Sequence, residues 1–162
     1  MLFRSAEKYQ LTRSDTDNFG LQSQMRAKAA IENGHFDSQI IPVEAPEMDD
    51  NFERTDKILR VTTDEVPRET SLDALAGLKS VAREDGVHTA GTSSQIADGA
   101  AAVLMMSASK AAELGLSPIA VIRASALVGC DPVMMLEGPI PATEKMLKQT
   151  GLNIADIDVF EV

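Results

Sequence analysis

Helical spacing of apolar residues predicts a long helix near the start of the chain. Leu21 and Met25 begin a stripe that repeats every four residues, and Thr12 with Asp15 forms a capping-box start in which Asp replaces the usual Glu or Gln. An acidic residue in the first turn also complements the helix dipole. Gly34 is of the residue type that commonly ends helices, so we expect this helix to close there.

Caps and apolar spacing predict three shorter helices further along. The first is capped by Thr70 or Ser71 and carries leucines at three-residue steps. The second is capped by Ser107 and closed by Gly115. The third covers 142–150, with a proline before it, where proline is tolerated, and a glycine after it.

Short apolar runs predict strands between these helices. The runs are 39–43, 57–61, 100–106, 119–128 and 156–162. The run 100–106 fits a buried strand by its length, and a buried helix segment has the same pattern. The acidic stretch 44–56 is predicted to be a solvated excursion. Alternating strands and helices in the final third favour an α/β fold with right-handed crossovers and a parallel sheet.

The composition is that of one globular domain. The chain has 162 residues, of which 44% are hydrophobic and 25% are charged. Aromatic residues make up only 4%, so stacking platforms for single-stranded nucleic acid are not expected. The net charge of −10 also disfavours nucleic acid and anionic membranes as partners. The acidic composition is still compatible with a small anionic ligand, provided that a few Arg side chains and backbone amides bind it locally.

One cysteine and two histidines restrict the possible chemistry. Cys130 alone excludes an internal disulfide, and His35 and His88 have no companions at metal-ligand spacing. No apolar run approaches the roughly 20 residues of a membrane span. The first residues lack a hydrophobic signal core. We therefore expect no metal site, no membrane partner and a cytoplasmic location.

The stretch HTAGTSSQIADGAAAVLMMS, from His88 to Ser107, resembles the signature of thiolases, the acyl-CoA acyltransferases. Three further blocks resemble the same family in the same order: 12–43, 64–79 and 129–161. They carry Gly34-His-Phe, Asp64-Glu and Gly129-Cys-Asp-Pro, respectively. Together the four blocks cover nearly the whole chain, which makes the resemblance specific.

The resemblance implies an α/β thiolase fold fragment. In thiolases, two similar α/β halves pack together and a loop domain folds over coenzyme A (CoA). Residues 1–96 then form most of the loop domain, 97–117 finish the N-terminal half and 118–162 begin the C-terminal half. The chain would be the interior of a longer protein that cleaves or condenses 3-ketoacyl-CoA thioesters. Its substrate would be CoA or acyl-CoA, with no permanently bound cofactor, and the parent would assemble as a homo-oligomer, either a dimer or a tetramer.

The catalytic motifs of the family do not occur in the sequence. Thiolases use an acceptor Cys, an acid/base Cys, a His in Gly-His-Pro and an Asn-Glu-Ala-Phe loop. Thiolysis needs a thiolate beside a base, together with donors that face the developing oxyanion. Cys130 and two remote histidines do not supply these groups. We therefore assign no catalytic residue, expect the chain alone to be inactive, and expect it to contribute CoA binding.

Ser94, Ala90 and Arg68 are the candidate CoA-binding residues. By resemblance, Ser94 matches the serine that contacts pantetheine, and Ala90 maps beside the pantetheine path, where a small side chain is needed. A hydroxyl in a Gly- and Ala-rich bend also suits a thin polar ligand. The triplet 92–94 equally fits a helix cap and turn. Arg68 maps near a family arginine at the nucleotide end, and it could instead form a surface salt bridge.

The other reactive or polarisable residues are expected to be structural. Cys130 follows an apolar run and is predicted to be buried, and His88 is predicted to make a polar structural contact. Packing in a core or in an interface is expected for four methionines: Met105, Met106, Met134 and Met135. No GxGxxG or Walker sequence indicates a nucleotide-binding fold.

Two other functions stay open on the sequence. The chain could be a non-catalytic CoA-binding or assembly subunit on a thiolase scaffold. It could also be an acidic α/β interaction domain with no CoA site. Affinity for CoA separates these possibilities.

Overall fold

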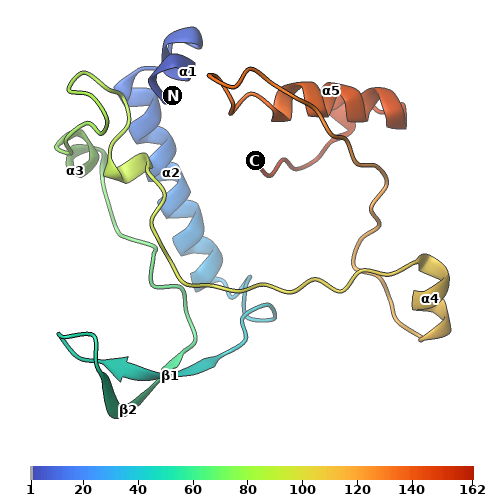
Figure 1. Ribbon diagram of the computed structural model, residues 1–162, viewed down its shortest axis with the longest axis horizontal. Helices are drawn as coiled ribbons and strands as arrows, with labels where there is room; N and C mark the ends of the chain where they lie inside the picture. Colours follow the sequence, from blue (N-terminus) through green and yellow to red (C-terminus); the bar gives the residue numbers. More distant parts are fainter. Residues whose placement is uncertain (1) are drawn as a thin grey trace. The chain divides into compact units, whose positions relative to one another are not determined.

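The computed structural model describes residues 2–162, which divide into two compact units. One unit is formed by 9–97, and the other by 2–8 with 98–162. No helix within 2–162 combines the length and the apolar composition needed to cross a membrane. Figure 1 shows the elements, which in chain order are α1 (Leu2–Lys8), α2 (Arg13–Glu32), β1 (Val43–Met48), β2 (Arg54–Val61), α3 (Leu72–Ala76), η1 (Ala90–Thr92), α4 (Ala108–Glu113), α5 (Pro139–Thr150) and η2 (Ile154–Asp156).

The long helix α2 begins as the sequence predicts. The Thr12 backbone N–H donates to the Asp15 carboxylate at 2.8 Å, and the Asp15 N–H donates to the Thr12 hydroxyl at 3.2 Å. This reciprocal pair satisfies backbone donors that a helix start leaves free. The hydrogen bonds from the Thr12 side chain and backbone also lower the pKa of Asp15. The helix ends at Glu32, and Gly34 follows with a φ of 69°.

The core of the 9–97 unit lies where the first half of α2 meets α3 and the segment 87–93. Leu75 of α3 is only 3% exposed, and Thr89 is fully buried. Thr16 on α2 donates its hydroxyl to the Val87 carbonyl at 2.7 Å. The predicted Ser71 cap of α3 is confirmed, since the Ser71 side chain accepts from the Ala74 N–H. These contacts tie three segments together that lie far apart in the sequence.

Two glycines bring the backbones of this core close to one another. A Cβ on Gly20 would lie 2.9 Å from the Gly91 carbonyl oxygen, closer than real Cβ contacts. A Cβ on Gly91 would overlap the Leu75 side chain. Larger side chains at either position would therefore push α2, α3 and the 87–93 segment apart.

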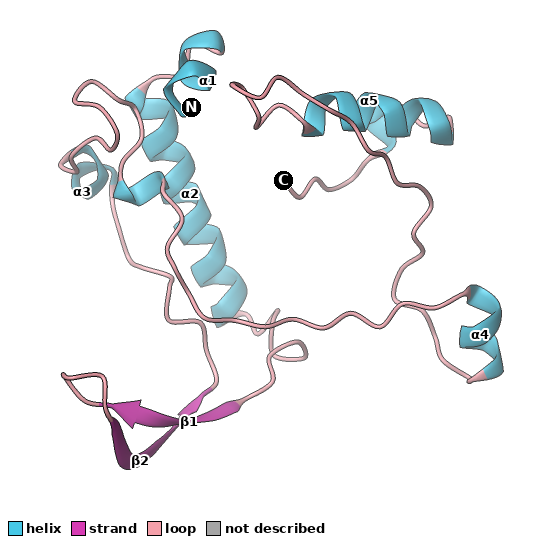
Figure 2. Ribbon diagram, in the orientation of Figure 1, coloured by secondary structure: helices cyan, strands magenta, loops and turns pink. Residues whose placement is uncertain are grey.

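The acidic stretch after α2 forms a β-hairpin. β1 and β2 are antiparallel, with Val43 opposite Val61 (Figure 2). The predicted strand over 39–43 is therefore wrong, whereas the strand over 57–61 is confirmed within β2. The acidic stretch 44–56 is exposed or half-buried, as expected of a solvated segment, and it forms the turn and the adjoining parts of both strands. The Asp49 carboxylate explains the turn, because it accepts from the backbone of Asn51 and Glu53 at 2.8 and 2.9 Å.

The 98–162 segment has the predicted helices and lacks the predicted strands. Ser107 caps α4, and Gly151 ends α5 with a φ of 72°. Residues 100–106, 119–128 and 157–162 form no strand (Figure 2), and in residues 2–162 the predicted parallel sheet is replaced by the β1–β2 pair. A strand needs a backbone partner alongside, and none of the described residues pairs with these runs. Their apolar side chains are accordingly exposed, as at Ile119 and Leu127.

The approach of Gly20 to the Gly91 carbonyl can be tested by substitution. Replacing Gly20 with Ala adds helix propensity worth about 1 kcal/mol. The backbone clash outweighs this gain, and we expect a net destabilisation of about 1–3 kcal/mol. Gly77→Ala is the matched control, because its nearest neighbour would be 3.5 Å away and its φ is −72°. Thermal unfolding should show a lower midpoint for Gly20→Ala alone, and equal midpoints for the two variants would contradict this packing.

Candidate functional site

Three hydroxyl residues, Thr89, Thr92 and Ser93, shape the segment 89–94, which we call the 89–94 turn. Thr89 accepts from the Gly91 N–H through its hydroxyl, and its own N–H donates to the Thr92 hydroxyl, both at 3.1 Å. Ser93 donates its hydroxyl to the Thr89 carbonyl at 2.7 Å. The buried Thr89 therefore has its side chain, N–H and carbonyl all hydrogen-bonded within the turn, as burial of polar groups requires.

Ser94 is the member of the hydroxyl triplet that the turn does not use. The cap interpretation is confirmed for Thr92 and Ser93, whose hydroxyls bond to Thr89. The Ser94 hydroxyl donates only to the Gln95 carbonyl, at 3.3 Å in an exposed position. Ala90, the first residue of η1, is exposed as well. The turn thus presents a small side chain and a weakly bonded hydroxyl at its surface.

Arg68 lies on an extended segment that runs beside α2. Its backbone N–H donates to the Gln24 side chain at 2.8 Å, which fixes the segment to the helix. Gln95, the residue after Ser94, reaches the Val66 carbonyl at 3.5 Å. The structure therefore brings the segments that carry Ser94 and Arg68 next to each other, although 26 residues separate them in the sequence.

The Arg68 guanidinium is exposed and makes no ion pair within the part of the chain that the structure describes. Its acidic neighbour Glu69 pairs with Lys28 on α2 instead. The hydrogen bond and the charge attraction of that pair raise the pKa of Lys28 and lower the pKa of Glu69. The salt-bridge alternative is thus not realised for Arg68, and its guanidinium is available to an anion.

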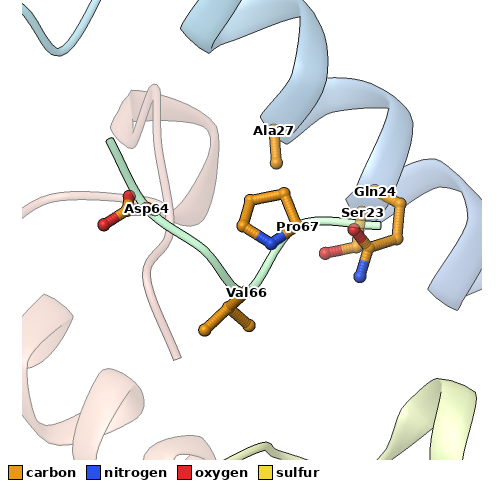
Figure 3. Close-up of a pocket in the computed structure, with 6 residues that line it drawn as sticks. All are labelled: Ser23, Gln24, Ala27, Asp64, Val66 and Pro67. Atoms are coloured by element: carbon orange, nitrogen blue, oxygen red, sulfur yellow. The ribbon is translucent and has the colours of Figure 1, made fainter. Parts of the chain in front are cut away.

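A shallow depression of about 220 Å³ lies between α2 and the residues before Arg68 (Figure 3). The ring of Pro67 faces the Ala27 methyl group, and the Gln24 side chain lies beside the ring on the same helix. The remaining lining residues are Ser23, Asp64 and Val66. Sequence reasoning missed this depression, although Gln24, Ala27 and Asp64 were among the residues that carry the family resemblance.

One expectation for a residue outside this region is wrong. Cys130 is exposed, not buried, and its thiol donates to the Met135 carbonyl at 3.2 Å. This exposure arises because the apolar runs of 98–162 have no packing partner among the described residues. Met105 and Met135 are also exposed, which excludes core packing for them, and their packing in an interface stays a prediction.

His88 is half-buried, and its backbone carbonyl accepts from the Val81 N–H at 2.9 Å. Its predicted side-chain role stays a prediction. Within 2–162, no group of three acidic, His or Cys side chains is placed to hold a metal ion.

The arrangement favours binding over covalent chemistry. Ser94 offers a hydroxyl, Ala90 a small surface and Arg68 a permanent positive charge. These groups suit a thin polar ligand with an anionic end. The single thiol, on Cys130, donates its hydrogen to the Met135 carbonyl and not to a basic side chain.

Comparison with known proteins agrees with the four sequence blocks. Residues 3–109 match the model of the thiolase N-terminal domain, and 116–162 match that of the thiolase C-terminal domain. A 3-ketoacyl-CoA thiolase of Marinomonas sp. (strain MWYL1) is 49% identical over 154 residues, which are 94% of this chain and 38% of the relative. An acetyl-CoA acetyltransferase of Chromobacterium violaceum is 44% identical over 96% of this chain and 38% of its own length.

A solved structure gives the same result for the fold. The crystal structure of the Bacillus anthracis acetyl-CoA acetyltransferase superposes with a TM-score of 0.87 at 39% identity, covering 95% of this chain and 38% of the other. The chain therefore spans about two fifths of the length of the proteins it matches. The sequence motifs, the matched domains and the superposition agree, and the chain belongs to the thiolase family.

Proposed function

We propose that this chain is the CoA-binding part of a thiolase-type acyltransferase that acts on acyl-CoA and 3-ketoacyl-CoA thioesters. The reaction would be thiolytic cleavage or the reverse Claisen condensation, and related proteins are named for these activities. In this proposal Ser94 and Ala90 contact the pantetheine arm and Arg68 contacts the nucleotide end. The assignment of 1–96 to a loop domain, the homo-oligomeric parent and the cytoplasmic location stay predictions.

The observation that carries the proposal is the state of the Ser94 hydroxyl. A hydroxyl that stabilises a fold is normally engaged in a well-formed hydrogen bond, as those of Thr92 and Ser93 are. The Ser94 hydroxyl instead has a long bond to the adjacent residue and faces solvent. It can exchange that bond for a ligand carbonyl or amide at little cost to the fold.

The positive charge of Arg68 also supports the proposed CoA binding. A chain with a net charge of −10 repels an anionic ligand at long range. Binding then depends on a cation that is not already neutralised. Arg68 meets this condition because Lys28, not Arg68, neutralises Glu69.

A second function, that of an assembly subunit without chemistry, is favoured by one observation. The runs around Ile119 and Leu127 expose large apolar side chains, with exposed fractions of 106% and 92%. Exposed apolar surface of this extent marks an interaction site. An assembly role and CoA binding are compatible, whereas turnover by the chain would exclude an assembly role without chemistry.

Substitution of Ser94 tests the proposed pantetheine contact. Ser94→Ala should weaken the affinity for CoA by about 3- to 10-fold, the range expected for one lost neutral hydrogen bond. Calorimetric titration with CoA measures the effect. Ser38→Ala is the control, because Ser38 is an exposed serine of the same unit with no hydrogen bond. Equal affinities for Ser94→Ala and the unaltered chain would remove Ser94 from the site.

Substitution of Arg68 tests the nucleotide contact through its salt dependence. Arg68→Gln should weaken CoA binding by about 3- to 10-fold at low salt. The difference should shrink as added salt screens the exposed charge. Arg54→Gln, an exposed arginine on β2, removes the same charge from the hairpin and should leave the affinity unchanged. A loss that is the same for both variants would indicate a general charge effect and no contact at Arg68.

The chain alone should not turn over a 3-ketoacyl-CoA in the presence of CoA. Its single thiol, on Cys130, donates its hydrogen to the Met135 carbonyl and not to a base that would deprotonate it, so we expect it to be a poor nucleophile. Chromatographic analysis of the thioesters should show unchanged starting material, with a full-length thiolase as the positive control. Formation of acyl-CoA product by the purified chain would refute this expectation.

A further inference from the structure

Arg13, the first residue of α2, forms an unusual set of hydrogen bonds. Its Nε donates to both carboxylate oxygens of Asp17, at 3.0 and 2.9 Å. Its Nη2 donates to the Leu75 carbonyl at 2.6 Å and to the Leu78 carbonyl at 3.0 Å. Asp17 is only 5% exposed, so the ion pair is largely shielded from solvent. The Arg13 guanidinium thus connects the buried Asp17 carboxylate on α2 with the backbone carbonyls of Leu75 and Leu78.

The Leu75 carbonyl lies in the last turn of α3, and the Leu78 carbonyl lies two residues beyond the end of the helix at Ala76. The last carbonyls of a helix have no partner in a continuing helix and accept from other donors. The Leu75 carbonyl accepts from the Leu78 N–H, and Arg13 supplies a second donor to it. Arginine is suited to this task because its planar fork has several donors at fixed angles, and the Asp17 carboxylate holds that fork in place.

The position of α3 in turn determines where the 89–94 turn lies. A Cβ on Gly91 would overlap Leu75 and would lie 3.2 Å from the Leu78 side chain. On its other side, the Gly91 carbonyl faces Gly20 of α2. Gly91 is therefore held between the two helices that Arg13 connects.

We propose that Arg13 is a positioning residue for the 89–94 turn. By fixing the end of α3 to Asp17, it sets the position of Gly91 and, through it, of Ala90 and Ser94. The consequence for ligand binding rests on the proposed CoA-binding function. The effect on the order of the turn does not depend on that function, so the two can fail separately.

Amide hydrogen exchange on the chain tests the positioning role directly. Arg13→Gln removes the charge and the fork, and Arg13→Lys keeps the charge without donors that reach Asp17 and two carbonyls together. Both variants should increase exchange in 86–95 by about 10-fold or more, through local opening of the turn. Exchange in the hairpin 43–61 should not change. Arg26→Gln, an exposed arginine on the same helix, should have no effect in either segment.

The exchange result decides the proposal even if one variant is unstable. If Arg13→Gln unfolds the whole unit, the milder Arg13→Lys replaces it in the comparison. Unchanged exchange of 86–95 in Arg13→Lys would overturn the positioning role. An equal increase in the turn and in the hairpin would also overturn it, because that pattern indicates general loss of stability.

A double substitution links the turn to CoA binding. Arg13→Lys should weaken CoA binding by about 10-fold in the unaltered background and by clearly less in the Ser94→Ala background, because residues that act through one contact are not additive. Additive losses would show that Arg13 does not act through Ser94. If the unaltered chain does not bind CoA at all, the proposed function fails, and the exchange comparison still decides whether Arg13 positions the turn.

Discussion

The burial of Thr89 is the constraint on which the 89–94 turn depends. A fully buried threonine must have its polar groups satisfied, and here its hydroxyl, N–H and carbonyl are bonded to Gly91, Thr92 and Ser93. Loss of the bond to Gly91 or of the bond to Thr92 would leave the Thr89 hydroxyl or N–H without a partner, whereas the Thr89 carbonyl also accepts from the Thr92 N–H at 3.1 Å. The turn therefore has one well-determined shape, and its surface residues Ala90 and Ser94 are presented by a rigid base.

That rigidity bears on the proposal that a strongly acidic chain binds an anionic substrate. The long-range field is unfavourable, so affinity must come from short-range groups that are already in place. The Lys28–Glu69 pair leaves Arg68 unpaired, and the Gln24 and Gln95 side chains hold its segment beside the turn. The Arg68 guanidinium comes from a different part of the sequence than the Ala90 side chain and the Ser94 hydroxyl. All three residues belong to the same compact unit, 9–97.

Local signals in the sequence were sufficient for α2, α3, α4 and α5 but not for the short helix α1 or for most of the predicted strands. The Thr12–Asp15 capping box, the Ser71 and Ser107 caps and Gly151 each act within a few residues, so their predictions were correct. The runs 100–106 and 119–128 have strand composition, but a strand exists only where another backbone lies beside it. The same reasoning explains why Cys130 is exposed although its neighbours are apolar. The hairpin was not predicted because its pairing depends on the turn at Asp49. The sequence analysis interpreted Asp49 as one of many acidic residues in a solvated stretch, not as a turn residue. Ser94 and Arg68 are proposed as site residues through family resemblance, whereas the contacts that distinguish Ser94 from Ser93 required coordinates.

The most direct test of this account is a map of backbone amide chemical shifts as CoA is added to the isotope-labelled chain. If the 89–94 turn and the Arg68 segment form the CoA contact, amides of Ala90, Ser94 and Arg68 should shift with a common saturation curve, and amides of the 43–61 hairpin should not. Shifts confined to the hairpin or to 98–162, or no saturable shifts at millimolar CoA, would contradict the account.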